Sequence, residues 1–224
     1  MGLFPNSHLP NPEPVDKVIP PLLEAIKRKD IVAVNALLAE GADPNSCTYS
    51  SHWKDDSLRW TALHEAVMAD SLELVRLLVE AGADIDYCSL AHGTALALAA
   101  TGSLPMVQYL VEQGADVNLF PINKYPVLTE PVDDGDVQIV DYLIEHGADV
   151  NLSNNRGETV LMYAAQALQL DMVKKLVEAG AKVSICDVRR HNAIWYARKR
   201  SRGQPEDAQL REEVIAFLKQ YASN

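Results

Sequence analysis

The sequence lacks the motifs on which common enzyme mechanisms depend. Its 224 residues contain no glycine-rich phosphate loop, no His-Glu-x-x-His, no Cys-x-x-Cys and no Gly-x-Ser-x-Gly. The six histidines are scattered along the chain, and the acidic group within residues 130–136 lacks the spacing of a calcium-binding loop. We therefore expect a protein that is not an enzyme and that uses no cofactor or metal ion.

Long apolar runs are missing as well. No stretch approaches the roughly 18 apolar residues that a membrane-spanning helix needs. The first residues lack the basic start and apolar run of a secretory signal, and Asn6 stands where the myristoylation pattern requires Ser or Thr. These absences predict a soluble, cytoplasmic protein that does not act at a membrane.

Cysteine is scarce, and its odd count of three argues against a disulfide framework. Cys47, Cys88 and Cys186 each stand six residues after a glycine of the repeat described next, so they share one structural position. We expect small, buried side chains in the stem of a hairpin at this position. No histidine stands at ligand spacing beside them, which disfavours a metal site.

The chain does contain one phrase repeated five times. Its glycines lie 41, 32, 33 and 33 residues apart, and the copies are Gly41-Ala-Asp-Pro-Asn45, Gly82-Ala-Asp-Ile-Asp86, Gly114-Ala-Asp-Val-Asn118, Gly147-Ala-Asp-Val-Asn151 and Gly180-Ala-Lys-Val-Ser184. A period near 33 residues is typical of stacked units that cannot bury their apolar faces alone. The sequence therefore predicts one elongated repeat domain.

The unit that ends at Gly180 shows how each copy folds. Residues 154–157 have the composition of a turn, and Thr159 is placed to cap a first helix. A second helix over 171–179 has an apolar stripe, and Gly180 ends it in a left-handed conformation. The stripe consists of Met172, Val173, Leu176 and Val177. Each unit is thus a turn followed by two antiparallel helices.

This pattern resembles the ankyrin repeat, whose units begin Thr-Pro-Leu-His and end Gly-Ala-Asp-Val-Asn. The matching helix starts are Thr61-Ala-Leu-His64, Thr94-Ala-Leu-Ala97, Pro126-Val-Leu-Thr129 and Thr159-Val-Leu-Met162. The resemblance covers roughly residues 17–221. It implies an all-α solenoid of about six helix-turn-helix units with hairpin-like turns, capped at both ends. It also implies structural hydrogen bonds for His64 and for the hairpin asparagines Asn118 and Asn151.

The repeat phase divides the chain into a lead, a single domain and two insertions. Residues 1–16 contain four prolines and are expected to be extended or disordered. The domain spans 17–221, and the two insertions cover 46–58 and 199–208. Its units lie near 17–45, 59–92, 93–124, 125–157, 158–190 and 191–221.

Two local features of the helices also follow from the sequence. Pro131 falls inside the first helix of the fourth unit, where its ring clashes with the preceding turn, so we expect a distorted or shortened helix at 127–134. A last helix from Leu210 to Tyr221 is expected to close the stack. Its inward residues are predicted to be Val214, Phe217, Leu218 and Tyr221.

Partners of ankyrin repeats usually bind the concave side, which hairpin tips and first helices form. The resemblance places there the residue before each Thr position and the residues seven and eight after it. With Trp53 and Arg156 added from the long insertion and a hairpin tip, the candidate partner-binding residues are Trp53, Trp60, Met68, Tyr125, Asp133, Asp134, Arg156, Glu158, His191, Lys199 and Arg200. For Trp60 a structural role beside the long insertion is an equal alternative. Trp195 is expected to pack inside the last unit.

Charge gives the expected partner. The net charge is −11, but residues 1–186 carry 12 basic and 26 acidic residues, whereas 187–224 carry 8 and 5. An acidic body favours a partner protein with a basic surface and disfavours nucleic acid. We therefore expect a monomeric protein-interaction module, for example an inhibitor or adaptor, that acts through an acidic and aromatic concave face.

Two alternatives to this general role stay open. One is an immunity or antitoxin-like inhibitor of a basic toxin. The other is nucleic-acid binding through the basic cluster near the C-terminus. That cluster consists of Arg189, Arg190, Arg198, Lys199, Arg200 and Arg202.

Overall fold

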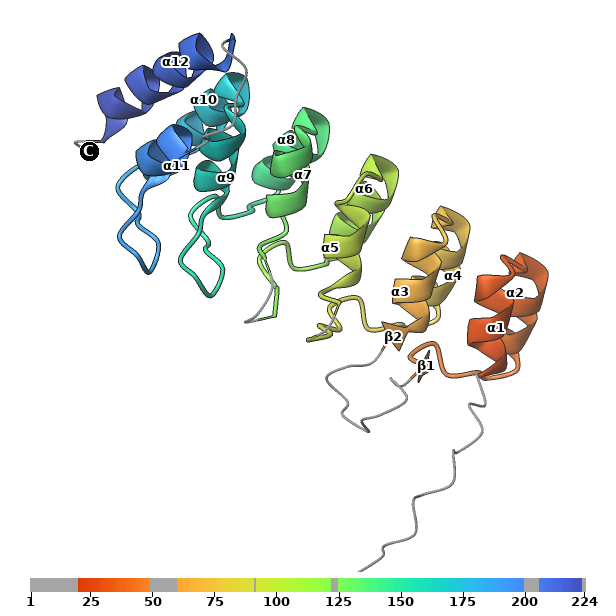
Figure 1. Ribbon diagram of the computed structural model, residues 1–224. Coiled ribbons are helices and arrows are strands. Elements are labelled where there is room, and N and C mark those ends of the chain that lie inside the picture. Colours follow the sequence, from red (N-terminus) through yellow and green to blue (C-terminus); the bar gives the residue numbers. More distant parts are fainter. Residues whose placement is uncertain (1–19, 49–59, 91, 122–124, 200–205, 223–224) are drawn as a thin grey trace, which may run out of the picture.

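The structure is a computed structural model that describes residues 20–48, 60–90, 92–121, 125–199 and 206–222. Its helices follow one another in pairs along a curved row (Figure 1). Their bounds are α1 Pro21–Lys27, α2 Ile31–Ala39, α3 Ala62–Met68, α4 Leu72–Glu80, α5 Ala95–Ala99, α6 Leu104–Glu112, α7 Thr129–Asp134, α8 Val137–Glu145, α9 Val160–Ala167, α10 Leu170–Glu178, α11 Ala193–Lys199 and α12 Glu206–Tyr221. The predicted fold class, an all-α solenoid of about six helical pairs, is confirmed.

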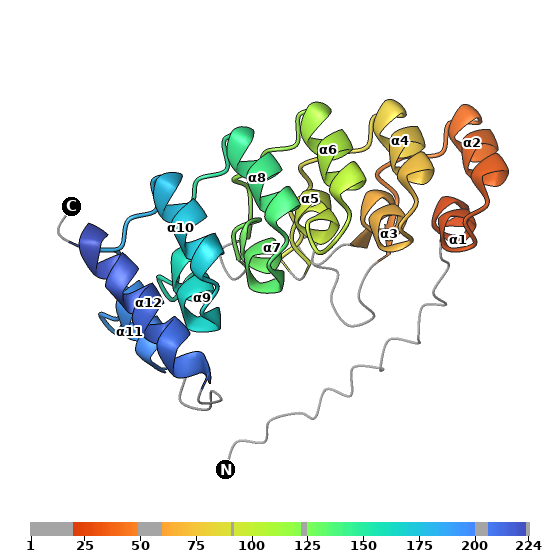
Figure 2. The same cartoon turned by 90° about the horizontal axis from the view of Figure 1, so that it is seen from above.

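The pairs stack so that equivalent helices lie side by side. Seen from above, the first helices α1, α3, α5, α7, α9 and α11 line the inner side of the curve, and the second helices α2 to α10 form the outer side (Figure 2). The last helix, α12, packs against α10 and α11 and closes the row. The hairpin-like connections project from one edge (Figure 1).

Short polar residues and glycine fix where the helices begin and end. Thr61 and Thr94 have extended backbones, and their hydroxyls accept the N–H of the residue three positions later. The repeat glycines have φ between 90° and 94°, which side chains adopt only with strain. Directly after Gly180, the Ala181 N–H donates to the carbonyl of Leu176 at 2.9 Å. The predicted left-handed helix end at Gly180 is confirmed.

One apolar core runs through the whole row. The largest fully buried side chains are leucines, isoleucines and a methionine drawn from every unit between α1 and α8. In α10 the predicted stripe of Met172, Val173, Leu176 and Val177 is buried. Because each stripe faces the next pair as well as its own partner helix, no pair can bury its apolar surface alone.

The repeated Gly-Ala-Asp-Val-Asn phrase is explained by hydrogen bonds between hairpins. Within the fourth hairpin, Asp149 Oδ1 accepts the Asn151 N–H at 2.8 Å and orients the asparagine. The Asn151 side chain then donates to the carbonyl of Gly180 at 3.0 Å and accepts the N–H of Lys182 at 2.8 Å. Asn118 makes the same pair of bonds to Gly147 and Asp149, at 3.0 and 2.8 Å. We call each such pair of bonds a brace.

The second hairpin has only half a brace. Asp86 stands at the asparagine position, and its Oδ1 accepts the N–H of Asp116 at 2.9 Å. A carboxylate has no proton to donate, so it cannot bond the carbonyl of Gly114 as an asparagine would. The bracing role expected of Asn118 and Asn151 is confirmed, and the joint at Asp86 is the weaker one.

His64 makes the structural contacts that the resemblance implies. Its Nε2 lies 3.1 Å from the carbonyl of Gly93 in the next hairpin, and its Nδ1 lies 2.6 Å from the hydroxyl of Thr61. Burial lowers the pKa of the imidazole, against the raising effect of the Gly93 carbonyl. The neutral ring therefore ties its own helix cap to the neighbouring hairpin.

Pro131 has the predicted effect on its helix. By analogy with Thr61 and Ala62, the helix should begin directly after Pro126, but α7 begins only at Thr129. This later start places Pro131 in the first turn. Backbone N–H groups of the first turn have no carbonyl partner within the helix, so the N–H that proline lacks costs no hydrogen bond there. The first helix of the fourth unit is therefore shortened.

Three other expectations need correction. α12 begins at Glu206, inside the predicted insertion at 199–208, and not at Leu210. Tyr221, predicted to face inward, is 39% exposed, whereas Ile215 is buried. Cys47 and Cys88 are only half-buried and Cys186 is exposed, because the last hairpin has a neighbour on one side only. Residues 47–48 also form a two-residue strand, β1 Cys47–Thr48, which pairs antiparallel with β2 Trp60–Thr61.

Several predictions concern residues that the structure does not describe. These are the lead at 1–16, the part of the first insertion from 49 to 58, and the part of the second from 200 to 205. They stay predictions.

The braces predict stability changes of opposite sign at equivalent positions. Asp86→Asn adds a donor facing the Gly114 carbonyl and should raise the free energy of unfolding by about 1 kcal/mol, whereas Asn151→Asp removes the donor to Gly180 and should lower it by about 1–2 kcal/mol. Urea unfolding followed by circular dichroism measures both. Repeating it at high salt separates the hydrogen bonds from the change in net charge, because salt screens exposed charges. Equal effects of the two variants, or effects abolished by salt, would contradict the role of the brace.

Candidate functional site

One exposed residue per unit forms a row along the inner side of the curve. Each member stands seven residues after the Thr position of its repeat, which Thr61, Thr94, Pro126, Thr159 and Asn192 occupy, and each is exposed. From the second unit to the sixth, the members are Met68, Thr101, Asp133, Gln166 and Lys199. We call this set the concave row. Its chemistry changes from apolar at Met68, which is 61% exposed, through acidic at Asp133 to basic at Lys199.

The residues just before the caps lie beside the concave row, but most are engaged. Trp60 is half-buried, donates from Nε1 to Glu65 Oε2 at 2.7 Å, and packs against the rings of His64 and His92. These contacts favour the structural role that the sequence left open for Trp60. Tyr125, in contrast, is 39% exposed and meets the ring of Tyr163 edge to face at 6.1 Å.

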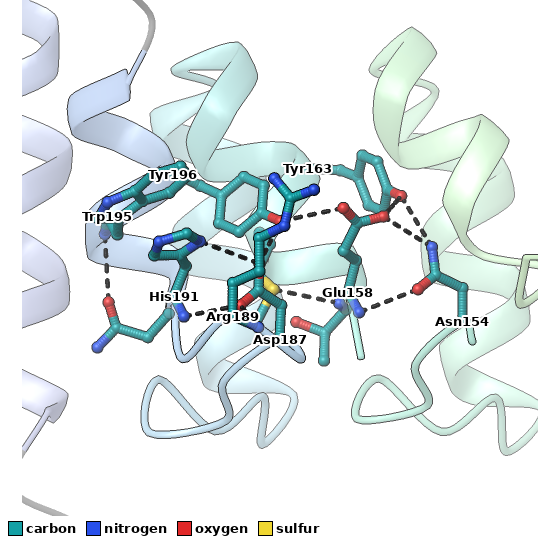
Figure 3. A network of polar contacts seen from close by, with 11 residues as sticks. Asn154, Glu158, Tyr163, Asp187, Arg189, His191, Trp195 and Tyr196 are labelled. Carbon is teal, nitrogen blue, oxygen red and sulfur yellow. Dashed lines mark hydrogen bonds and ion pairs between the residues drawn. The ribbon is translucent and has the colours of Figure 1, made fainter. Parts of the chain in front are cut away.

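A polar network links the hairpins and first helices of the fifth and sixth units (Figure 3). At its centre is the half-buried carboxylate of Glu158. Glu158 Oε2 accepts from Asn154 Nδ2 and from the Tyr163 hydroxyl, both at 2.8 Å. Glu158 Oε1 lies 3.0 Å from the hydroxyl of Tyr196, which belongs to the next unit. The network therefore ties α9 to α11 by side chains as well as by packing.

Asp187 is the second carboxylate of this network. Its Oδ1 accepts the backbone N–H groups of Arg189 and His191 at 2.8 and 2.7 Å, and closes the last hairpin tip. Its Oδ2 lies 3.0 Å from the Tyr196 hydroxyl and 3.2 Å from His191 Nδ1. The single proton of Tyr196 serves Glu158 or Asp187 but not both at once, so each carboxylate depends on its other donors.

Aromatic stacking extends the network to the end of the concave row. The imidazole of His191 stacks on Trp195 with ring centroids 3.5 Å apart, and the ammonium of Lys199 lies 4.6 Å from the centroid of the indole. Trp195 is only half-buried. The expectation that it packs inside the last unit is therefore met in part: one side touches the core, while the ring also holds His191 and Lys199.

Both carboxylates of the network are stabilised in the ionised form. Burial alone would raise the pKa of Glu158, but hydrogen bonds from Asn154, Tyr163 and Tyr196 hold it below its ordinary value. Burial likewise would raise the pKa of Asp187, and the bonds from His191, Tyr196 and Arg189 lower it. Burial and the adjacent carboxylates raise the pKa values of the Tyr163 and Tyr196 hydroxyls. Negative charge is thus fixed beside neutral, donating tyrosines.

A shallow hollow opens between α7 and α9 on the concave side. Its lining consists of Asp133, Tyr163, Gln166 and Ala167. The Gln169 side chain joins the two helices by donating to the carbonyl of Asp133 at 3.0 Å. The hollow therefore combines one aromatic ring, Tyr163, with one carboxylate, Asp133.

The structure sorts the predicted partner-binding residues into groups. Met68, Tyr125, Asp133, Asp134, Arg156 and Lys199 are exposed, whereas Trp60, Glu158 and His191 are half-buried and bonded to neighbours. Trp53 and Arg200 lie outside the described residues.

Sequence analysis did not single out Tyr163, Tyr196 and Asp187 for this surface. Tyr163 and Tyr196 stand four residues after the cap position, and this repeated spacing is the signal that could have found them.

The described part of the chain contains neither a cluster of metal ligands nor a membrane-spanning helix. Among these residues, no group of three or more histidine, cysteine or carboxylate side chains could hold a metal ion. No helix within 20–48, 60–90, 92–121, 125–199 or 206–222 has the length and apolar character to cross a bilayer.

The network predicts acid-sensitive stability. Asp187→Asn keeps the turn-closing oxygen, as Asn154 does in the preceding hairpin, but loses the charge. We expect a loss of about 1–2 kcal/mol at pH 7. Because the folded pKa of Asp187 is lowered, its contribution is present above the unfolded value of about 4 and is lost as the pH falls further. The difference between wild type and variant in urea unfolding should therefore shrink below about pH 4. A difference independent of pH would mean that the charge of Asp187 does not contribute.

Comparisons with known proteins agree with this architecture. The curated mouse protein "2-5A-dependent ribonuclease" is 41% identical over 63 residues, which is 28% of this chain and 8% of that protein. The chain therefore matches only a small part of that relative, and the ribonuclease activity in the name refers to that whole protein.

Solved structures match over most of the chain. An ankyrin repeat domain from Acinetobacter baumannii AYE superposes with a TM-score of 0.72 at 24% identity, covering 90% of this chain and 97% of that one. The human ASB11 ankyrin repeat domain superposes with a TM-score of 0.69 at 26% identity, covering 91% and 84%. The family model of ankyrin repeats matches residues 22–120 and 124–207. The chain therefore belongs to the ankyrin repeat family, whose repeats generally mediate protein–protein interaction.

Proposed function

We propose that this protein binds a partner protein through the concave side of its fourth and fifth units, and that the partner presents a basic surface there. The observation that carries the proposal is the hollow between α7 and α9. Exposed Asp133 lines it, and its other polar wall, Tyr163, contacts exposed Tyr125 and the ionised carboxylate of Glu158. No catalytic group is needed for this function.

The chemistry of the hollow fits a lysine or arginine side chain. The aromatic ring of Tyr163 attracts a cation, and the carboxylate of Asp133 can accept its hydrogen bonds. Asp133 and Asp134 are exposed at the end of α7, so they attract a basic surface before contact and affect the association rate. Glu158 is already ionised and bonded, so it contributes charge with little reorganisation.

The tyrosines suit this role because they are held in place before a partner arrives. Tyr163 is fixed by its hydrogen bond to Glu158 and by the ring of Tyr125. Aromatic side chains often supply much of the binding energy of protein interfaces. A side chain that is already ordered loses less entropy on binding. These properties favour a protein partner over a small ligand, because the hollow is shallow.

Charge reversal of the acidic pair tests the proposal. A partner is first captured with the wild-type protein and identified by mass spectrometry, and its affinity is then measured by calorimetry. The double variant Asp133→Lys/Asp134→Lys should weaken binding at low salt by roughly tenfold, which corresponds to about 1.4 kcal/mol. The loss should diminish at high salt, because screening weakens exposed charge pairs.

The matched control is Glu178→Lys, which makes the same kind of charge reversal at the exposed end of α10 on the outer side. It should leave the affinity within about twofold of wild type after correction for net charge. If the double variant binds as tightly as the control, the concave side of the fourth unit is not the binding surface.

A further inference from the structure

The concave side carries two charges of opposite sign in a fixed order. Asp133, together with Asp134, lies on α7, and Lys199 lies at the end of α11, with α9 between them. All three of these charged residues are exposed, as is Arg189 at the neighbouring hairpin tip. Gln166, the member of the concave row between the two ends, is uncharged.

Aromatic side chains lie between the two charged ends. Exposed Tyr125 and half-buried Tyr163 stand beside the acidic end. Tyr196 of the next unit is buried and is joined to Tyr163 through the carboxylate of Glu158. Trp195 meets Tyr196 edge to face and carries Lys199 over its ring. A surface with aromatic groups along its length and charges at both ends is suited to an extended chain segment, because each position offers a contact to one side chain.

We infer that the concave side of the last three units binds an extended segment of the partner with basic residues at one end and acidic residues at the other. This inference rests on the proposed function and adds the order of charges in the partner. The basic residues lie against Asp133, Asp134 and the hollow. The acidic residues lie against Lys199 and Arg189, beside the indole of Trp195.

The spacing of the helices sets the length of the segment. α7 packs against α9, and α9 packs against α11. Packed helices have axes about 8–10 Å apart, so the two charged ends are separated by roughly 20 Å. An extended chain advances about 3.3 Å per residue, and the basic and acidic residues of the segment should therefore lie about six residues apart.

Selection from a library of random peptides displayed on phage tests this order of charges. The whole protein is immobilised, and bound phage are sequenced after elution with salt. We expect enriched peptides that contain a basic group and an acidic group about six residues apart. Asp133→Lys should abolish enrichment of the basic group and leave the acidic group enriched. Lys199→Glu should abolish enrichment of the acidic group and leave the basic group enriched. Each single reversal should weaken binding of a synthetic wild-type-selected peptide by roughly tenfold.

The fourfold variant Asp133→Lys/Asp134→Lys/Arg189→Glu/Lys199→Glu gives the sharpest result. It exchanges the signs of the two ends, so peptides selected on the wild type should no longer be enriched on it, and a different set of peptides, again with a basic and an acidic group about six residues apart, should replace them. Thermal unfolding confirms that each variant is folded, and Glu178→Lys serves again as the control that should not change the selected pattern.

The outcomes separate this inference from the proposed function. Peptides that are only basic, and that respond to Asp133→Lys but not to Lys199→Glu, overturn the two-signed segment and leave the proposed function intact. No enrichment, or enrichment that no concave variant changes, overturns both. A third outcome concerns nucleic acid. If the protein binds a single-stranded oligonucleotide in a salt-sensitive way, and Lys199→Glu abolishes this binding but does not change the selected peptides, the basic end binds nucleic acid and the inference is overturned.

Discussion

The spacing between neighbouring hairpins determines where every side chain of the concave side stands, and a pair of hydrogen bonds from one asparagine holds that spacing. The bonds join the side chain of Asn118 or Asn151 to two backbone groups of the next hairpin. The preceding aspartate fixes the asparagine, and the glycine presents its carbonyl because it ends a helix in the left-handed conformation. The repeated phrase is thus one device that ends a helix, turns the chain and positions the next unit.

Polar bonds of this kind also build the surface near the C-terminus. Two carboxylates, Glu158 and Asp187, are kept ionised near one tyrosine hydroxyl by bonds from neighbouring side chains and backbone groups. Burying charge is unfavourable unless hydrogen bonds compensate. Here the compensating bonds come from hairpin tips of two successive units, so the same contacts that join the units also fix the charge of the surface.

Much of this architecture could be predicted because it depends on local sequence. The phase of the repeat placed the caps, the glycine helix ends, the shortened helix at Pro131 and the concave row. The partners of Tyr163 and Tyr196 could not be predicted in the same way, because each tyrosine contacts a residue of another unit. Tyr163 meets the ring of Tyr125, and the hydroxyl of Tyr196 meets Glu158, 38 residues away in the chain. The exposure of Cys186 and Tyr221 likewise depends on their places in the last hairpin and the last helix of the described stack, which pack against a neighbour on one side only.

The half brace at Asp86 has a mechanical consequence. In a stacked array each unit contacts only its neighbours, so a load applied to one end passes through every joint in turn. The joint between the second and third hairpins resists with one side-chain hydrogen bond, whereas those formed by Asn118 and Asn151 resist with two. We therefore expect the array to bend most easily at this joint. Such bending would move the end that carries Met68 relative to the block that carries Asp133 and Lys199, whose hairpins are held by full braces.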